Sequence, residues 1–355
     1  IETMLLLAIN YPTLIATKAS RIVTSAKGRA VLEFGARRAH GFDASLEGAR
    51  SAIIAGAVGT SHTLAGQKYG AYVSGTMAHS FIQLYETEYE AFKSYAKINP
   101  ENTVFLVDTY DTLASGVPNA IKVAKEVLHP QGHRLKAIRL DSGDLAYLSK
   151  KARVMLDEAG LEDCQIMASN SLDEYIIDDL IYQGAQIDQF GVGENLITSK
   201  SEPVLGGVYK LVAQEIDGKV VPKIKISDNI EKITNPGYKR LYRFYDNHTN
   251  KALADYIALH DEVIPEDEIE IFDPVAPWKR KTLTNYTVRE LQVPIFLDGA
   301  YVYEEKELFD ISVYAQKERE TFWEEVKRLH YPFKYYVDLS QKLYDLKLGL
   351  LHENE

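Results

Sequence analysis

A single histidine, His79, lies where the sequence predicts the end of a strand and the start of a helix. Residues 71–73 are typical of a short strand, residues 74–76 break it, and helical spacing begins near Ser80. Free N–H groups and the dipole of a helix N-terminus attract phosphate. An imidazole at such a point can act as a base, an acid or a phosphate acceptor. A histidine hydrogen-bonded in a turn is the alternative that this pattern leaves open.

Acidic side chains follow two of the predicted strands as Asp-x-x-Asp pairs. The first pair is Asp108 and Asp111, and the second is Asp141 and Asp144. Because Mg²⁺ takes carboxylate oxygens and bound phosphates as ligands, these pairs beside arginines are typical of a polyphosphate held through Mg²⁺. Each aspartate fits a helix N-cap or a turn equally well. We therefore expect Mg²⁺ as a cofactor but assign no side chain as its direct ligand.

A glycine-rich turn, Gly191-Val192-Gly193, follows a later predicted strand. Its glycines allow backbone N–H groups to approach an anion closely, and barrel enzymes often bind phosphate after their late strands. By itself the motif predicts only a turn. Basic side chains add positive charge to the same face of an otherwise acidic chain; they are Arg37, Arg38, Arg139 and Lys210.

The elements that must position these residues alternate between strand and helix up to residue 212. Short apolar strands between helices predict a parallel sheet with both faces covered. Eight such strands favour an irregular (β/α)₈ barrel, with its active site where polar residues follow the strands. An open doubly wound sheet would give the same local pattern. The strands are expected at 31–35, 55–58, 71–73, 103–107, 135–138, 165–168, 187–190 and 207–212.

Helical spacing of apolar residues predicts the helices that cover this sheet. The first is expected over residues 1–27, where Pro12 should interrupt it, and another runs from Ser80 through Lys93. The others are expected at 44–54, up to Tyr69, and at 118–128, 145–159 and 173–183.

The pattern changes after Val212. Asp217-Gly218 between two β-type segments predicts a hairpin, and residues 241–245 and 254–259 predict a second antiparallel pair. The predicted fold class is therefore α/β, with a second, smaller α+β domain.

The last part of the chain is expected to be largely helical. Residues 273–278 should form a rigid connector, and residues 304–329 and 338–351 should form amphipathic helices with solvated charged faces. The predicted domain organisation is a barrel domain with a helical lead-in at 1–213, antiparallel hairpins at 214–272, and a C-terminal helical region at 273–355 that packs on both.

Composition excludes several classes of protein. The 355 residues carry a formal net charge of -11, so we expect no nucleic-acid partner. A single cysteine, Cys164, excludes a disulfide framework and a cysteine-rich zinc site, and we expect a cytoplasmic protein. No apolar run approaches the roughly 18–20 residues of a membrane span, so we expect no membrane association. Because the chain starts at Ile1 inside an apolar helical pattern, we expect an N-terminal portion to precede it.

Six blocks of sequence, in the same order along the chain, resemble nicotinate phosphoribosyltransferases of the bacterial kind. The resemblance implies a type II phosphoribosyltransferase-like fold, with an irregular barrel beside a second domain, and a homodimer whose active sites lie at the interface. It implies that nicotinate and phosphoribosyl pyrophosphate give nicotinate mononucleotide and pyrophosphate in NAD biosynthesis, with coupled hydrolysis of ATP. The blocks are 33–39, 59–61, 74–80, 139–144, 190–193 and 205–211.

The resemblance also implies roles for individual residues. His79 matches the histidine that ATP phosphorylates, Asp108 is expected to orient it, and Asp141 matches a residue near the ribose hydroxyls. The implied nicotinate-binding residues are Phe34, Arg37, Ser61, Thr76 and Arg139. A phenylalanine ring stacks on a pyridine, and a guanidinium donates two parallel hydrogen bonds to a carboxylate.

Phosphate recognition and acid specificity follow from the same resemblance. Ser61 stands where the sister enzyme that uses nicotinamide carries aspartate, so the neutral residue favours the acid. Glu194 departs from the threonine of many members, and we assign it no phosphate contact. A tyrosine that the family's N-terminal part supplies to the partner's pocket lies outside these residues. The implied residues that bind phosphoribosyl pyrophosphate are Arg139, Asp141, Ser169, Asn170, Gly191, Gly193 and Lys210.

Two alternatives stay open from the sequence. One is a related phosphoribosyltransferase that uses nicotinamide or quinolinate, against which Ser61 and the block around His79 speak. The other is a catalytically silent barrel that acts as a binding or oligomerisation module.

Overall fold

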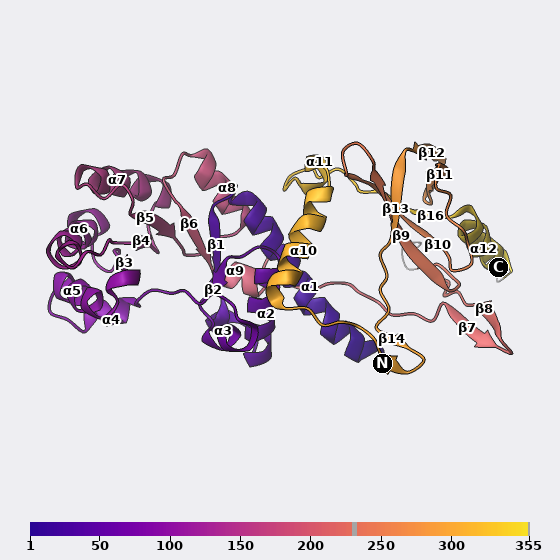
Figure 1. Ribbon diagram of the computed structural model, residues 1–355, viewed down its shortest axis with the longest axis horizontal. Helices are drawn as coiled ribbons and strands as arrows, with labels where there is room; N and C mark the ends of the chain where they lie inside the picture. Colours follow the sequence, from indigo (N-terminus) through magenta and orange to yellow (C-terminus); the bar gives the residue numbers. More distant parts are fainter. Residues whose placement is uncertain (229–232, 354–355) are drawn as a thin grey trace. The chain divides into compact units, whose positions relative to one another are not determined.

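Six short parallel strands form the sheet on which the predicted site residues converge. A computed structural model describes residues 1–228 and 233–353. The sheet lies in the first of two compact units, residues 3–206 and 307–316, which we call the sheet unit (Figure 1). In the order β2-β1-β6-β5-β4-β3, the strands are β2 (Gly59–Thr60), β1 (Ala30–Glu33), β6 (Gln189–Val192), β5 (Gln165–Ala168), β4 (Ala137–Leu140) and β3 (Val104–Leu106).

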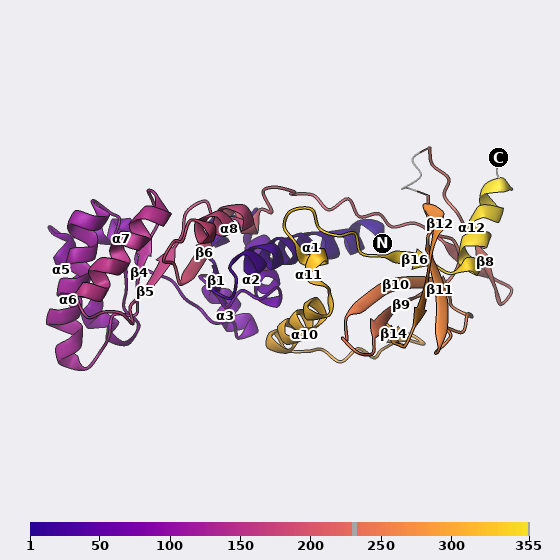
Figure 2. The same cartoon turned by 90° about the horizontal axis from the view of Figure 1, so that it is seen from above.

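Helices between the strands cover this sheet, as the alternating pattern predicts. In both ribbon views α5, α6 and α7 lie beside β3, β4 and β5 (Figure 2). Of the helices that lie mainly in this unit, the longer ones are α1 (Glu2–Ser25), α2 (Phe42–Ile54), α5 (Glu88–Ile98), α7 (Leu145–Glu158), α8 (Glu174–Tyr182) and α10 (Leu308–Thr321). The shorter helices are α3 (Thr63–Tyr69), α4 (His79–Gln83), α6 (Val117–Val123) and α9 (Glu194–Ile197).

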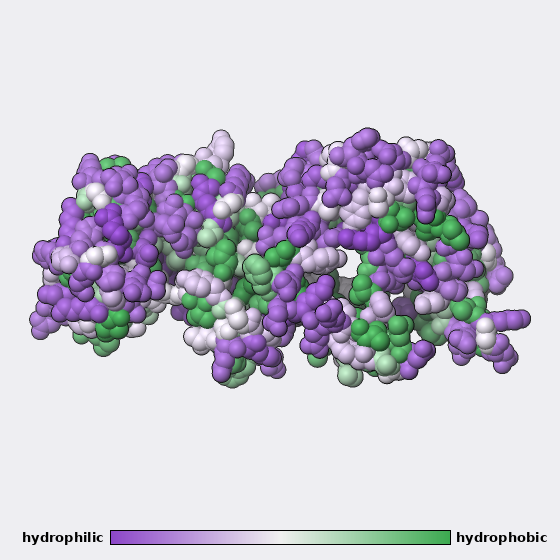
Figure 3. Space-filling model, viewed as in Figure 1, coloured by the Kyte–Doolittle hydropathy of each residue, from purple (hydrophilic) through white to green (hydrophobic). Residues whose placement is uncertain are grey.

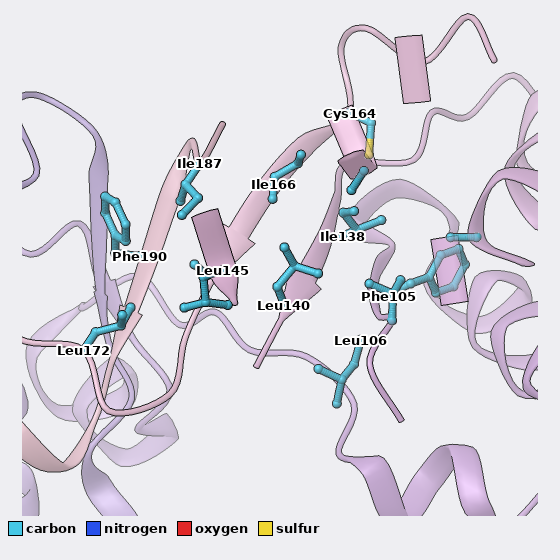
Figure 4. Close-up of a cluster of buried hydrophobic side chains, with 14 of the residues drawn as sticks. Phe105, Leu106, Ile138, Leu140, Leu145, Cys164, Ile166, Leu172, Ile187 and Phe190 are labelled. Atoms are coloured by element: carbon cyan, nitrogen blue, oxygen red, sulfur yellow. The ribbon is translucent and has the colours of Figure 1, made fainter. Parts of the chain in front are cut away.

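The core of the sheet unit consists of apolar side chains from neighbouring strands. Phe105, Ile138, Ile166 and Phe190 are completely buried and come from β3, β4, β5 and β6 (Figure 4). The surface over α5, α6 and α7 is mostly hydrophilic on the face shown in Figure 3. Burial of the strands on both faces explains why they read as short apolar runs rather than alternating ones.

Two helix predictions are wrong in detail. Pro12 does not interrupt the first helix: α1 continues through it. Proline removes one backbone hydrogen bond, but burial of Ile15, Ala19 and Ile22 on the far side of Pro12 holds the helix together. The helix expected from Ser80 to Lys93 is two helices, α4 and α5. The Thr87 side chain accepts a hydrogen bond from Glu90 N at 3.2 Å and starts α5 afresh.

Five of the eight expected strands overlap strands of the described sheet, and the one expected at 55–58 is displaced to β2 at 59–60. Residues 71–73 contribute only a bridge between Val73 and Thr60. Further along the same segment, Met77 Sδ accepts a hydrogen bond from Leu106 N at 3.4 Å. Residues 207–212 form no strand, because Val208 and Leu211 are exposed and have no buried face to join. Closure of this sheet into a barrel stays a prediction.

The second unit, residues 1–2, 207–306 and 317–355, is rich in antiparallel strands, and we call it the β-rich unit. Its main sheet has the order β13-β9-β10-β16. These strands are β13 (Tyr286–Glu290), β9 (Lys239–Asp246), β10 (Ala252–Leu259) and β16 (Val337–Leu339). The predicted antiparallel pair of β9 and β10 is confirmed.

Within the part of the β-rich unit that the structure describes, three hairpins and two helices accompany the main sheet. The predicted hairpin at Asp217-Gly218 is confirmed, with both residues at positive φ. The connector expected at 273–278 is wrong: Asp273 Oδ1 accepts from Val275 N at 2.9 Å in a tight turn. The elements are β7 (Ala213–Ile216), β8 (Lys219–Pro222), β11 (Glu268–Asp273), β12 (Ala276–Thr284), β14 (Phe296–Leu297), β15 (Ala300–Tyr301), α11 (Glu324–Lys327) and α12 (Gln341–His352).

No helix within residues 1–228 and 233–353 has the length and apolar character needed to cross a membrane.

Candidate active site

A cavity of about 160 Å³ lies where four strands of the parallel sheet end. Parallel pairing in register, such as Leu32 with Gly191 and Leu140 with Ala168, brings the carboxyl ends of β1, β6, β5 and β4 to one edge. Active sites of parallel α/β proteins form at this edge. The lining residues are Phe34, Arg37, Arg38, Arg139, Asp141, Ser169, Asn170, Ser171, Gly191, Gly193 and Glu194.

The guanidinium of Arg139, on β4, organises the cavity. Its Nη1 donates to Thr76 Oγ1 at 2.8 Å and its Nη2 donates to Asp141 Oδ1 at 2.9 Å. Its Nε donates to Ser169 Oγ at 2.8 Å, and its carbon Cζ lies 5.5 Å from the centre of the Phe34 ring. A guanidinium has five N–H donors. Three are engaged within the protein, so one on each terminal nitrogen is left for a ligand.

His79 is the first residue of α4, beside the ends of β3 and β4. Its Nδ1 lies 3.1 Å from Thr109 Oγ1. Its Nε2 lies 3.9 Å from Asp108 Oδ1 and 3.7 Å from Asp141 Oδ2. Because these two distances exceed hydrogen-bond length, the carboxylates act on the ring through charge rather than direct bonding. The side chain is 41% exposed and therefore accessible to a ligand.

Asp108 is buried beneath His79. Its Oδ2 accepts from Asp141 N at 2.9 Å and from Ser142 Oγ at 2.6 Å. Its Oδ1 is buried without a hydrogen-bond partner among the described residues. A buried carboxylate oxygen without a partner is costly, which indicates that this oxygen acts on another group, and the nearby His79 ring is one such group.

The turn expected at Gly191-Val192-Gly193 is wrong in position: Gly191 and Val192 lie within β6 and only Gly193 follows it, and both glycines have packing roles. A side chain at Gly191 would place its Cβ 2.5 Å from the Phe34 ring. At Gly193 a Cβ would lie 3.1 Å from Phe34 O. Glycine is therefore required at position 191 for the ring of Phe34 to lie against β6.

Backbone strain marks the end of β5. Asn170 and Ser171 both have positive φ, of 85° and 49°. The side chain of Asn195 donates to Ser171 O at 2.9 Å and holds this turn. Non-glycine residues in this region carry strain of about 1–3 kcal/mol, which is typical of functional sites.

A buried carboxyl group connects the turn after β1 to the end of β2. Glu33 is fully buried, and it accepts from Gly35 N and, at 2.6 Å, from Thr60 Oγ1. Burial raises the pKa of Glu33. Ser61 follows Thr60, and its backbone N donates to Glu33 O at 2.9 Å. Ser61 is exposed but does not line the cavity.

Two arginines and a glutamate lie at one side of the cavity. Arg38 Nε lies 3.8 Å from Glu194 Oε2, and Lys200 Nζ lies 3.2 Å from Glu194 Oε1. Arg37 lines the cavity and is exposed. The negative charge of Glu194 therefore faces basic partners, which explains how a carboxylate is tolerated at this edge.

The second aspartate of each Asp-x-x-Asp pair caps a helix. Asp111 Oδ1 accepts from Leu113 N and Ala114 N, at 3.0 and 2.7 Å. Asp144 Oδ1 accepts from Tyr147 N at 2.9 Å. The N-cap alternative is thus confirmed for these two residues, whereas Asp108 and Asp141 lie at the site. Among the residues that the structure describes, no group of three or more His, Cys, Asp or Glu is arranged to hold a metal ion.

One predicted site residue, Lys210, makes a different contact, and four residues at the site had no predicted role. Lys210 belongs to the β-rich unit, where its Nζ lies 3.2 Å from Glu2 Oε1. Sequence reasoning assigned no role to Glu33, Thr60, Thr109 or Ser142, which make the contacts described above. Glu33, Thr60 and Ser142 lie in the sequence blocks that resemble the family, and Thr109 directly follows Asp108. This proximity is the only signal in the sequence that points to them.

Comparisons with known proteins agree over both units. Residues 30–256 match the model of the nicotinate phosphoribosyltransferase (NAPRTase) family, and residues 238–347 match the nicotinate phosphoribosyltransferase C-terminal domain. The chain is 50% identical over 356 residues to nicotinate phosphoribosyltransferase of Bacillus subtilis, covering 99% of this chain and 72% of that protein.

Two further relatives extend this comparison. A nicotinate phosphoribosyltransferase of Mycobacterium tuberculosis is 43% identical over 271 residues, which cover 76% of this chain and 56% of that protein. The crystal structure of human nicotinic acid phosphoribosyltransferase superposes with a TM-score of 0.82 at 27% identity, covering 98% of this chain and 76% of that one. The chain therefore spans between about half and three quarters of the length of these relatives.

Proposed function

We propose a function from one premise: the chain belongs to the nicotinate phosphoribosyltransferase family. We propose that it joins nicotinate to the phosphoribosyl group of phosphoribosyl pyrophosphate, releasing nicotinate mononucleotide and pyrophosphate, with coupled hydrolysis of ATP. The observation that carries this proposal is the cavity itself. It brings the Arg139 guanidinium, stacked over Phe34, and the Gly191–Gly193 segment into one space.

Nicotinate would lie against Phe34, with its carboxylate toward arginine. Arg139 retains one N–H on each terminal nitrogen, which suits the two oxygens of a carboxylate. Arg37 supplies a second positive charge at the cavity. Thr76 holds Arg139 in place, and Ser61 adds no negative charge that would repel the acid.

The phosphoribosyl group would lie between Asp141 and the Gly191–Gly193 segment. Arg139 and Ser169 donate to Oδ1 of Asp141, and its second oxygen would accept from the ribose hydroxyls. The backbone at Gly191 and Gly193 suits the 5′-phosphate, and Asn170 lies at the same strand ends. In the transfer step the pyridine nitrogen attacks C1 and the bond from C1 to the pyrophosphate oxygen breaks. This step requires no protein nucleophile, so the residues act through position and charge.

Mg²⁺ and ATP are the expected cofactor and co-substrate. Mg²⁺ binds proteins through one or two carboxylates together with substrate phosphates. The unpartnered Oδ1 of Asp108 and the Oδ2 of Asp141 both lie within 4 Å of His79 Nε2 and fit this role. When bound, Mg²⁺ would offset the negative charge of pyrophosphate.

We further propose that ATP phosphorylates His79 and that the charge of Asp108 helps to orient the ring. A phosphohistidine adds charge and acceptor oxygens beside the cavity, which would couple ATP hydrolysis to turnover. We also propose a homodimer that completes the active sites across its interface, as the resemblance implies.

The first test measures products and protein phosphorylation together. The protein is incubated with labelled nicotinate, phosphoribosyl pyrophosphate, Mg²⁺ and ATP, and acid-labile phosphate is mapped by mass spectrometry. We expect nicotinate mononucleotide and phosphorylated His79, and we expect His79→Ala to lose ATP coupling while it retains slow ATP-independent turnover. Full ATP-coupled activity in His79→Ala would refute the role of His79.

A substrate panel separates the alternatives. Nicotinate should react far faster than nicotinamide or quinolinate. Tight binding of phosphoribosyl pyrophosphate without any turnover would instead favour a silent binding module.

A further inference from the structure

The only hydrogen bond of the His79 ring within the described residues is the one to Thr109. Thr109 Oγ1 lies 3.1 Å from Nδ1. On the other side of the ring, Asp108 Oδ1 and Asp141 Oδ2 lie 3.9 and 3.7 Å from Nε2, beyond hydrogen-bond length. His79 is 41% exposed and begins a helix of only five residues. Charge alone gives no fixed direction to a ring in such a setting, whereas a hydrogen bond does.

The backbone of Thr109 is held on both sides. Before it, Val107 N donates to Arg139 O at 3.1 Å, and Val107 O packs so closely on Gly116 that a Cβ there would lie 1.8 Å away. After it, Asp111 caps the segment that begins at Thr112. The contacts of Val107 and Asp111 on either side of Thr109 therefore restrict the position of its hydroxyl.

We propose that Thr109 is the positioning residue of His79: its hydroxyl accepts a hydrogen bond from Nδ1–H, which leaves the lone pair on Nε2 toward Asp108 and Asp141. This inference rests on the proposed phosphorylation of His79. In that step a bond forms from Nε2 to the γ-phosphorus of ATP while the bond from that phosphorus to the ADP oxygen breaks, and ADP leaves. The proton on Nδ1 stays on the ring and is stabilised by Thr109 as positive charge develops.

Substitutions at Thr109 separate its hydroxyl from its shape. Thr109→Val keeps the size of the side chain and removes the hydroxyl, whereas Thr109→Ser keeps the hydroxyl. The matched control is Thr112→Val, three residues further along the same segment. The readout is the initial rate of acid-labile phosphate incorporation into His79 from labelled ATP, together with ATP consumed per nicotinate mononucleotide formed.

We expect Thr109→Val to phosphorylate His79 at least about tenfold more slowly. Thr109→Ser and Thr112→Val should stay within about twofold of the native protein. Equal phosphorylation rates in Thr109→Val and the native protein would overturn the proposal. If Thr109→Val folds poorly, Thr109→Ala provides a second variant without the hydroxyl. Its melting temperature is compared with that of the native protein to confirm that it is folded.

A spectroscopic readout tests the placement of the proton directly. In ¹⁵N-histidine-labelled protein, the His79 signals are identified by their loss in His79→Ala. We expect Nδ1 to be the protonated nitrogen in the native protein, and we expect Thr109→Val to shift the proton toward Nε2, which faces the two carboxylates. An unchanged tautomer in Thr109→Val would contradict the proposal, since a purely structural contact would not set the proton.

Failure of the inference can be distinguished from failure of the proposed function. If His79→Ala still shows ATP-coupled turnover, the proposed phosphorylation is wrong whatever Thr109 does. If His79→Ala loses coupling but Thr109→Val keeps it, only the positioning role is wrong.

Discussion

Two arginines, one in each unit, lie on strands and bind aspartate, yet their surroundings differ. Arg139 in the sheet unit contacts Thr76, Ser169 and Asp141 and borders a cavity. Arg243 in the β-rich unit lies opposite Asp255 on the next strand and binds both of its oxygens, at 2.7 and 2.9 Å. Each guanidinium donates one hydrogen bond from each of its three nitrogens, but only the remaining N–H groups of Arg139 lie at a cavity that a ligand can enter.

Aromatic rings complete the enclosure of Arg243. The guanidinium carbon lies 4.8 Å from the Phe322 ring centre and 5.8 Å from that of Tyr335, and Glu318 lies beside Nη1 at 3.5 Å. Although burial opposes its charge, hydrogen bonding and attraction to Asp255 raise the pKa of Arg243. The comparison shows that residue type and strand position do not distinguish a ligand-binding arginine from a structural one. The space beside the guanidinium does: Arg139 borders a cavity, whereas Arg243 lies against aromatic rings.

The strongest test of this difference is the loss of Arg139. We expect Arg139→Leu to lower kcat/KM for both substrates by about a thousandfold or more, because two charge-assisted hydrogen bonds at about 1.5–3 kcal/mol each are lost. The kcat/KM of Arg139→Lys should lie between that of Arg139→Leu and that of the native protein, because lysine keeps the charge but cannot reproduce the bidentate geometry. Steady-state kinetics with each substrate varied in turn measures the effect.

A parallel stability measurement serves as the control for Arg139→Leu. Its free energy of unfolding should fall by only about 1–2 kcal/mol. If unfolding accounts for the loss of activity, Arg139 is a structural arginine like Arg243 and the comparison fails.

The opposite pattern is expected for Arg243. Arg243→Leu should lower the free energy of unfolding by about 3 kcal/mol, because it leaves the Asp255 carboxylate buried without its cation. The double variant Arg243→Leu with Asp255→Leu should recover most of that loss, since removing both charges avoids the uncompensated one. Urea titrations measure both variants, and a double variant less stable than Arg243→Leu would contradict the proposed cause.

The sequence predicts which residues come together at the site, but it does not predict the hydrogen bonds between them. Asp141, Ser169 and Gly191 follow predicted strands, and parallel pairing alone brings strand ends together. Thr109 and Glu33 could not be assigned in this way. Their partners, His79 and Thr60, lie 30 and 27 residues away in the chain, so their contacts depend on tertiary packing that no local pattern encodes.

Turns and exposed apolar segments show the same difference between features set by local sequence and features set by tertiary packing. Asp217-Gly218 is correctly predicted because a two-residue turn is determined by its own residues. Residues 207–212 are apolar enough for a strand, but they pack against no sheet face, and their burial could not be inferred locally. The turn at Pro274 and Val275 resembled a connector because proline restricts both structures equally.

The smallest expected effect concerns a buried carboxyl group of the β-rich unit that, unlike Asp255, is not paired with an arginine. Asp338 is 3% exposed on β16, opposite Tyr256. Burial, with a contribution from the Asp273 carboxylate, raises its pKa to about 6. Above that pH the folded state holds a buried negative charge at a cost. As pH falls from 6 to 4, the folded protein binds a proton before the unfolded chain does, so stability is gained.

We therefore expect Asp338→Asn to raise the free energy of unfolding at pH 8 by about 1–2 kcal/mol, allowing for partial solvation of the group. The advantage should fade between pH 6 and pH 4, where the native side chain becomes neutral as well. Urea titrations at pH 8, 6 and 4 measure this, with Asp261→Asn as an exposed control in the same unit. An advantage that is constant with pH would show that asparagine stabilises through packing and not by removing charge. If Asp338→Asn does not raise the free energy of unfolding at pH 8, the Asp338 carboxylate is stabilised by its surroundings. Asp338 and Asp255 would then differ only in which groups stabilise their charge.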